Sequence, residues 1–114
     1  MTKEEINIRQ ANLKKYINAA AKISVKSSVL EGSTLAEVLD MDATKYSEVA
    51  FQSLNLSQRA FNCMSRYLNP PIQGIEERWQ ISDLLNLTIG NYVDVRNLGL
   101  EAFEEILSKI KELK

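Results

Sequence analysis

The amino-acid sequence predicts an all-α fold, a compact bundle of short helices in two tandem units preceded by a long N-terminal helix. The 114 residues contain only two prolines and four glycines, so little interrupts helix formation. Apolar residues recur at helical spacing near both ends of the chain. Residues 34–49 are also echoed without gaps by residues 80–95. These observations together favour helices over strands.

The length and composition are those of one ordinary globular domain, which we assign to residues 1–114. No apolar run approaches the length needed to cross a membrane, so we expect no membrane association. The N-terminus lacks the apolar core of a signal peptide. The single cysteine, Cys63, excludes an internal disulfide and fits a reducing compartment, so we expect a cytoplasmic protein.

The first expected element is an amphipathic helix, assigned to residues 1–30. Its lysines fall on the face opposite the apolar positions. They form either the solvated face of a helix that packs on the core or a basic arm that contacts phosphate. The apolar positions are Ile6, Leu13, Ile17 and Ala20, and the lysines are Lys15, Lys22 and Lys26.

The echoed segments define two helical repeats, residues 33–68 and 80–114. Each copy begins with two short helices, the second capped by Asp42 or by Thr88. A longer helix then closes each repeat, over Ser57–Leu68 and Leu100–Leu113. A unit this small buries its apolar face only against a neighbour, so we expect the two copies to pack on each other.

Residues 69–79 connect the repeats and are expected to form a loop. Pro70 and Pro71 end the preceding helix, and Gly74 lies within the connector. Trp79 closes the loop, either as an anchor to the core or as a platform for a ligand.

The residues that most enzymes and metal sites require are missing from the sequence. There is no histidine, and Cys63 has no neighbouring base to activate it. The acidic segment Asp40–Thr44 lacks the glycine of a calcium loop and has Phe51 at the twelfth position, so helix capping explains its acids better. No phosphate-binding glycine motif is present. We expect no enzymatic activity, no cofactor and no metal.

The charge distribution favours one region as a contact for nucleic acid. The net charge is only −1, which argues against strong non-specific DNA binding. Residues 51–75, however, contain Arg59 and Arg66 and no acidic residue. The helix in this window places Arg59, Asn62 and Arg66 on one face, with Cys63 one turn beyond Arg59. Such side chains suit phosphate oxygens and minor-groove acceptors, although the same pattern also occurs on solvated helix surfaces.

A second candidate contact is the segment Asn97-Leu98-Gly99. Gly99 can adopt the positive φ of a tight turn and lets a phosphate approach the backbone closely. The N–H groups at the start of the following helix would then face outward. An ordinary turn between two helices is the alternative interpretation.

These segments resemble the C-terminal domain of the bacterial RNA polymerase alpha subunit. The resemblance covers residues 51–114 and rests on residues 54–64, on Ile81-Ser-Asp-Leu and on residues 95–106. It implies tandem helix-hairpin-helix units, minor-groove contact with DNA upstream of promoters and contacts with transcription activators. By position it assigns DNA contact to Arg59, Asn62, Cys63 and Gly99, and it places Glu105 at an acidic position of the same surface.

The sequence also departs from that family. The family usually has lysines and a serine after the glycine, where this protein has Leu100, Glu101 and Ala102. The 69–79 loop is longer, and residues 1–50 do not match the usual linker, so we expect a stand-alone relative of the subunit.

Two functional hypotheses follow from the sequence. The first is a transcription-associated protein that binds the minor groove of A·T-rich DNA through Arg59, Asn62, Cys63, Arg66, Asn97, Gly99 and Glu105. The second is a module with little DNA affinity that docks on RNA polymerase or on a transcription regulator.

Overall fold

The computed structural model describes residues 2–24, 28–68 and 79–114 and confirms the all-α fold. The described residues form six α-helices and two short 3-10 helices, with no strand beyond two isolated β-bridges. None of these helices is long and apolar enough to cross a membrane. In sequence order the elements are α1 (Lys3–Ile23), α2 (Leu35–Leu39), η1 (Ala43–Tyr46), η2 (Phe51–Leu54), α3 (Gln58–Leu68), α4 (Ile81–Leu85), α5 (Ile89–Val93) and α6 (Gly99–Lys111).

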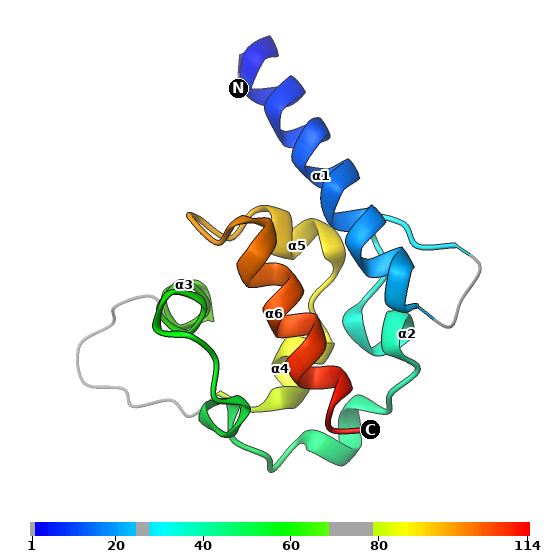
Figure 1. Ribbon diagram of the computed structural model, residues 1–114, viewed down its shortest axis with the longest axis vertical. Helices are drawn as coiled ribbons and strands as arrows, with labels where there is room; N and C mark the ends of the chain where they lie inside the picture. The colour runs from blue at the N-terminus through cyan, green and yellow to red at the C-terminus, as the bar shows by residue number, and fades with distance from the viewer. Residues whose placement is uncertain (1, 25–27, 69–78) are drawn as a thin grey trace.

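Helix α1 is shorter than the range 1–30 that the sequence predicts. The Thr2 hydroxyl caps it by accepting a hydrogen bond from the Glu5 N–H at 3.1 Å. The helix ends at Ile23, because Ser24 is extended and the serine- and valine-rich sequence that follows has weak helix propensity. Its first turns project beyond the rest of the molecule (Figure 1). Ile6, predicted on the buried stripe, is therefore 43% exposed, and α1 buries only Leu13, Tyr16 and Ala20.

The predicted helix caps are confirmed in both repeats. The Asp42 carboxylate accepts a hydrogen bond from the Thr44 N–H at 3.0 Å, and the Thr88 hydroxyl accepts one from the Asn91 N–H at 3.1 Å. The two copies differ in one respect, since Asp42 begins the 3-10 helix η1 whereas Thr88 begins the α-helix α5.

The two repeats contact each other, as their apolar faces predict. Helix α4 packs against both α2 and η1. Backbone hydrogen bonds also tie the starts of the helices together. The Leu35 N–H donates to the Leu87 carbonyl at 3.1 Å, and the Ile81 N–H donates to the Val49 carbonyl at 2.8 Å.

The core is centred on α6, which packs against α1 and α3. The Tyr16 ring of α1 stacks on Phe103 of α6 with centroids 4.6 Å apart, and Tyr92 of α5 lies 5.3 Å from the same ring. The buried Tyr92 hydroxyl donates a hydrogen bond to the Leu84 carbonyl at 2.7 Å, and its burial raises the pKa of Tyr92 well above the ordinary value. This packing fixes the start of α6 against α3, where the candidate site lies.

Two boundaries near the C-terminal repeat also differ from expectation. Residues 69–78 of the predicted loop lie outside the described residues, while Trp79 is half-buried and packs against the core. Helix α6 ends at Lys111, so Leu113, which the sequence places on the apolar stripe, is 37% exposed.

Candidate nucleic-acid interface

The turn before α6 has the conformation that its sequence predicts. Gly99 has a φ of 77° and Asn97 a φ of 64°, both in the left-handed region. Glycine adopts this region freely, and asparagine tolerates it better than most residues do. Leu98 between them is buried in the core and attaches the turn to it, while Asn97 and Gly99 are exposed to solvent.

Two side chains of α3 hold this turn through one carbonyl group. The Arg59 Nη2 and the Cys63 Sγ each donate a hydrogen bond to the Asn97 carbonyl oxygen, both at 3.5 Å. Arg59 and Cys63 are one helical turn apart, so both reach the same point. The structure thus brings together four of the residues that the sequence selects, namely Arg59, Cys63, Asn97 and Gly99.

The lack of a side chain at Gly99 makes room for Arg59. A Cβ atom added to Gly99 would lie 3.3 Å from the Arg59 Nη2, closer than most Cβ contacts. The exposed guanidinium therefore passes over the backbone of the turn. A positive charge and an open backbone segment lie side by side at this place.

Glu105 performs a structural task at the edge of the same surface. Its carboxylate accepts a hydrogen bond from the Ser57 N–H at 2.5 Å, while the Ser57 hydroxyl accepts one from the Ala60 N–H at 3.3 Å. Helix α6 thereby helps to cap the first turn of α3. Contact between Glu105 and DNA stays a prediction.

Asn62 and Arg66 are exposed on α3 but are not joined to the turn. Among the residues that the structure describes, neither side chain makes a hydrogen bond to residues 97–99. They share the α3 surface with Arg59, as helical spacing requires.

The start of α6 combines a favourable and an unfavourable feature for an anion. Leu98 precedes the helix and provides no side-chain cap, so the first N–H groups depend on solvent or a ligand. Glu101 in the first turn, however, is exposed and repels phosphate. The nearest compensating charge in sequence is Arg96, an exposed residue that adjoins Asn97 but was not among the DNA-contacting residues predicted from the sequence.

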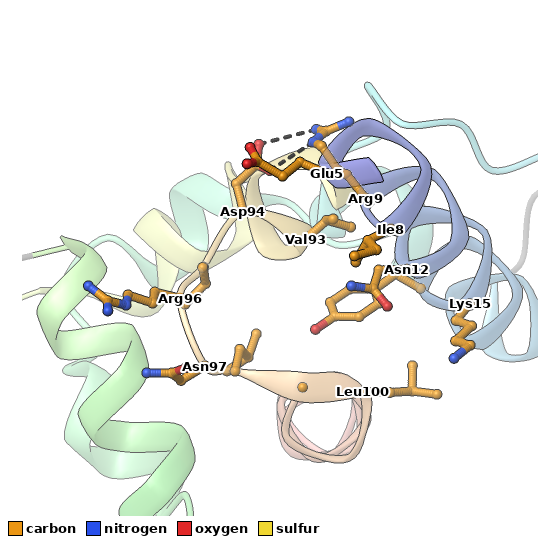
Figure 2. Close-up of a pocket in the computed structure, with 14 residues that line it drawn as sticks. Glu5, Ile8, Arg9, Asn12, Lys15, Val93, Asp94, Arg96, Asn97 and Leu100 are labelled. Carbon is orange, nitrogen blue, oxygen red and sulfur yellow. Dashed lines mark hydrogen bonds and ion pairs between the residues drawn. The ribbon is translucent and has the colours of Figure 1, made fainter. Parts of the chain in front are cut away.

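A groove of about 680 Å³ separates α1 from the segment that leads into α6. Figure 2 shows Asn12 and Lys15 of α1 on one side of it and Arg96, Asn97 and Leu100 on the other. No feature of the sequence could identify this groove, because it depends on how α1 packs against α5 and α6.

An ion-paired arginine fixes the outer end of the groove. The Arg9 Nε and Nη2 donate to the two carboxylate oxygens of Asp94 at 2.8 and 3.1 Å, and Nη2 lies 2.8 Å from the Glu31 carboxylate (Figure 2 shows the bonds to Asp94). These hydrogen bonds raise the pKa of Arg9. The arginine thus links the projecting part of α1 to the end of α5.

Tyr16 brings α1 close to the residues of the turn. Burial raises the pKa of the Tyr16 hydroxyl, and the positive charge of Arg59 opposes that rise. Tyr16 also lines the groove together with Asn97 and Gly99, so α1 lies beside the turn that Arg59 contacts, which was not evident from the sequence.

Comparison with known proteins decides the family. The family model for the C-terminal domain of the alpha subunit of bacterial RNA polymerase matches residues 37–112. This protein belongs to that family. The match begins at residue 37, so the predicted limit at residue 51 was too late and most of the first repeat belongs to the family region.

Curated relatives of the alpha C-terminal domain family agree with this assignment. The protein is 33% identical over 69 residues to the DNA-directed RNA polymerase subunit alpha of Fusobacterium nucleatum. The alignment covers 60% of this protein and 18% of that subunit. It is 30% identical over 106 residues to the same subunit of Carboxydothermus hydrogenoformans, an alignment that covers 85% of this protein and 31% of the subunit. It is 28% identical over 111 residues to the subunit of Bacillus velezensis, an alignment that covers 97% of this protein and 32% of the subunit.

The matched region thus spans between about a fifth and a third of the length of these relatives. No solved structure gives a significant match to this protein.

Proposed function

We propose that this protein is a transcription-associated DNA-binding protein that contacts the minor groove of A·T-rich DNA. The contact surface consists of the first turns of α3 and the Asn97–Gly99 turn. The observation that carries the proposal is the position of Arg59, whose guanidinium lies over the Gly99 backbone and is steadied by the Asn97 carbonyl. Membership of the alpha C-terminal domain family supports it, and such a protein would act in the cytoplasm.

The chemistry of these side chains suits an A·T-rich minor groove. A narrow minor groove concentrates negative potential and attracts an arginine guanidinium. Its floor presents the acceptors adenine N3 and thymine O2, which the amide of Asn62 can contact. The N–H groups at the start of α6 face the place where an adjacent phosphate would lie. Arg66, further along α3, adds charge for the backbone.

The proposal predicts modest and salt-sensitive affinity. The net charge of −1 and the position of Glu101 limit the long-range attraction to DNA. Binding would therefore depend on a few short-range contacts rather than on bulk charge. An affinity that falls as salt rises, with a small slope, is the expected signature.

Fluorescence anisotropy with labelled A·T-rich and G·C-rich duplexes tests this function in the full-length protein. Asn62→Ala is the cleanest variant, because Asn62 is exposed and makes no hydrogen bond to the turn. It should weaken A·T-rich binding by about tenfold, and Arg59→Ala by at least as much. Lys111→Ala, at the opposite end of α6, serves as the control and should bind as the parent does.

Two measurements separate loss of contact from loss of structure. Urea unfolding of each variant shows whether the helices remain intact. Arg59→Lys keeps the charge but loses the planar fork, so it should restore only part of the affinity. If both Asn62→Ala and Arg59→Ala bind A·T-rich DNA as tightly as the parent, the proposed surface is wrong.

A second function is favoured by one observation, the acidic Glu101 at the start of α6. A protein module that docks on RNA polymerase or on a transcription regulator would tolerate this charge, whereas a phosphate contact would be weakened by it. This alternative predicts no salt-dependent affinity for any duplex, together with capture of polymerase subunits by the tagged protein. If the tagged protein captures neither polymerase subunits nor a transcription regulator, this alternative is wrong.

A further inference from the structure

The groove between α1 and the start of α6 carries an unexplained positive charge. Lys15 lies on the α1 wall and is exposed. Figure 2 shows its side chain reaching toward the α6 side of the groove, where Leu100 lies. Arg96 lines the same groove from the opposite segment, and Figure 2 shows its guanidinium turned toward α3.

These two cations differ from the third one in the groove. Arg9 is neutralised by Asp94 and Glu31 through short ion pairs. In the part of the protein that the structure describes, neither Lys15 nor Arg96 takes part in an ion pair. Their charge is therefore available to a ligand. The negative charges of the groove lie at its outer end, where Glu5 stands beside the carboxylates that pair with Arg9.

The groove is also continuous with the surface proposed to bind DNA. Asn97 and Gly99 line it, and they belong equally to the turn that Arg59 contacts. A DNA strand that extends from this turn toward α1 would pass the mouth of the groove. The first turn of α6 offers that strand Leu100 and Glu101 but no cation, so on the side toward α1 a positive charge comes from Lys15 across the groove.

We propose that Lys15 binds a phosphate of the DNA backbone, so that α1 forms a second wall of the interface, while Arg96 contacts the same strand on the side toward α3. This inference rests on the proposed function and extends it by assigning a role to the N-terminal helix. The ion pairs of Arg9 hold α1 in place, so Lys15 is positioned before DNA arrives. It supplies the charge that the start of α6 lacks.

The matched variants Lys15→Ala and Lys14→Ala test this assignment. Both lysines are exposed on α1, but only Lys15 lines the groove. Binding of the full-length protein to an A·T-rich duplex is measured by anisotropy over a series of salt concentrations. Lys15→Ala should lower the affinity about three- to tenfold and reduce the slope of log affinity against log salt by about one. Lys14→Ala should leave both unchanged, and Arg96→Ala should resemble Lys15→Ala.

The outcomes distinguish this inference from the proposed function. If Arg59→Ala loses affinity while Lys15→Ala matches Lys14→Ala in affinity and slope, the inference is overturned and the DNA surface stands. That result would leave the groove, with exposed Ile8 at its rim, to a peptide segment of a protein partner. If the parent protein binds no duplex, the inference and the proposed function both fail. A loss specific to Lys15→Ala and Arg96→Ala supports the inference.

Discussion

The carboxylate of Glu105 accepts a hydrogen bond from the backbone N–H of Ser57, so α6 caps the helix that carries Arg59. This contact joins two segments that are far apart in the sequence. It fixes the first turn of α3 relative to the Asn97–Gly99 turn. The geometry of the candidate interface therefore depends on an acidic residue that need not touch DNA.

Glu105→Ala is expected to destabilise the protein by about 1–2 kcal/mol, because a charged helix cap is lost. Urea unfolding measures this change. DNA affinity should fall as well, since Arg59 loses its support. Glu104→Ala is the control, because Glu104 is exposed on the same helix and makes no such bond. Equal stability of the two variants would refute the capping role.

Gly99→Ala is expected to cost about 1–2 kcal/mol in stability, because alanine is strained at a φ of 77°. The new Cβ would also require the Arg59 guanidinium to shift slightly, because it would lie 3.3 Å from Nη2. Thermal unfolding and DNA anisotropy report these two effects separately. Gly32→Ala provides the comparison, since a Cβ at Gly32 meets nothing within 4 Å. A Gly99→Ala variant with parental stability and affinity would argue against both effects.

Glu101→Lys is expected to raise DNA affinity and to steepen its dependence on salt. The change replaces repulsion of phosphate by attraction at the start of α6. It should reduce stability by about 0.3–1 kcal/mol, because a cation is unfavourable at a helix N-terminus. Glu112→Lys, at the other end of α6, makes the same change of charge far from the turn. If Glu101→Lys and Glu112→Lys raise the DNA affinity equally, DNA does not bind at the start of α6 as proposed.

The ionisation of Tyr16 reports on the contact between α1 and the Arg59 region. Its pKa is raised by burial, so the associated stability is present below the ordinary tyrosine pKa of about 10 and is lost as pH rises through the raised value. Because the charge of Arg59 opposes the rise, Arg59→Ala should raise the Tyr16 pKa further.

A spectrophotometric titration measures this shift, with Tyr16→Phe identifying the signal among the four tyrosines. Lys111→Ala should leave the Tyr16 titration unchanged. An identical titration in Arg59→Ala would show that α1 lies further from Arg59 than the structure places it.

Local sequence signals predicted the helices and the turn at Gly99. Capping residues such as Asp42 and Thr88 act within a few residues, so their spacing identifies helix starts directly. The same is true of the Gly99 turn, which needs a residue that accepts positive φ. Helical periodicity placed Arg59 and Cys63 one turn apart, but their shared contact with Asn97 depends on the packing of α3 beside α6.

Features that depend on packing between distant segments could not be predicted. The capping role of Glu105 requires α3 and α6 to lie side by side, and the position of Lys15 requires α1 to lie against α5 and α6. Periodicity also assigned Ile6 to the core, since it cannot tell where a helix leaves the body of the molecule. Residue types alone likewise did not show that the second short helix is a 3-10 helix in the first repeat (η1) and an α-helix in the second (α5).

Titration of the isotope-labelled protein with an A·T-rich duplex, followed by two-dimensional NMR, tests the central claim most directly. We expect the largest shifts at the amides of Arg59, Asn62 and Gly99, with little change in α2 and η1. Amide shifts confined to residues outside α3 and the turn before α6, or no shifts at all, would contradict it.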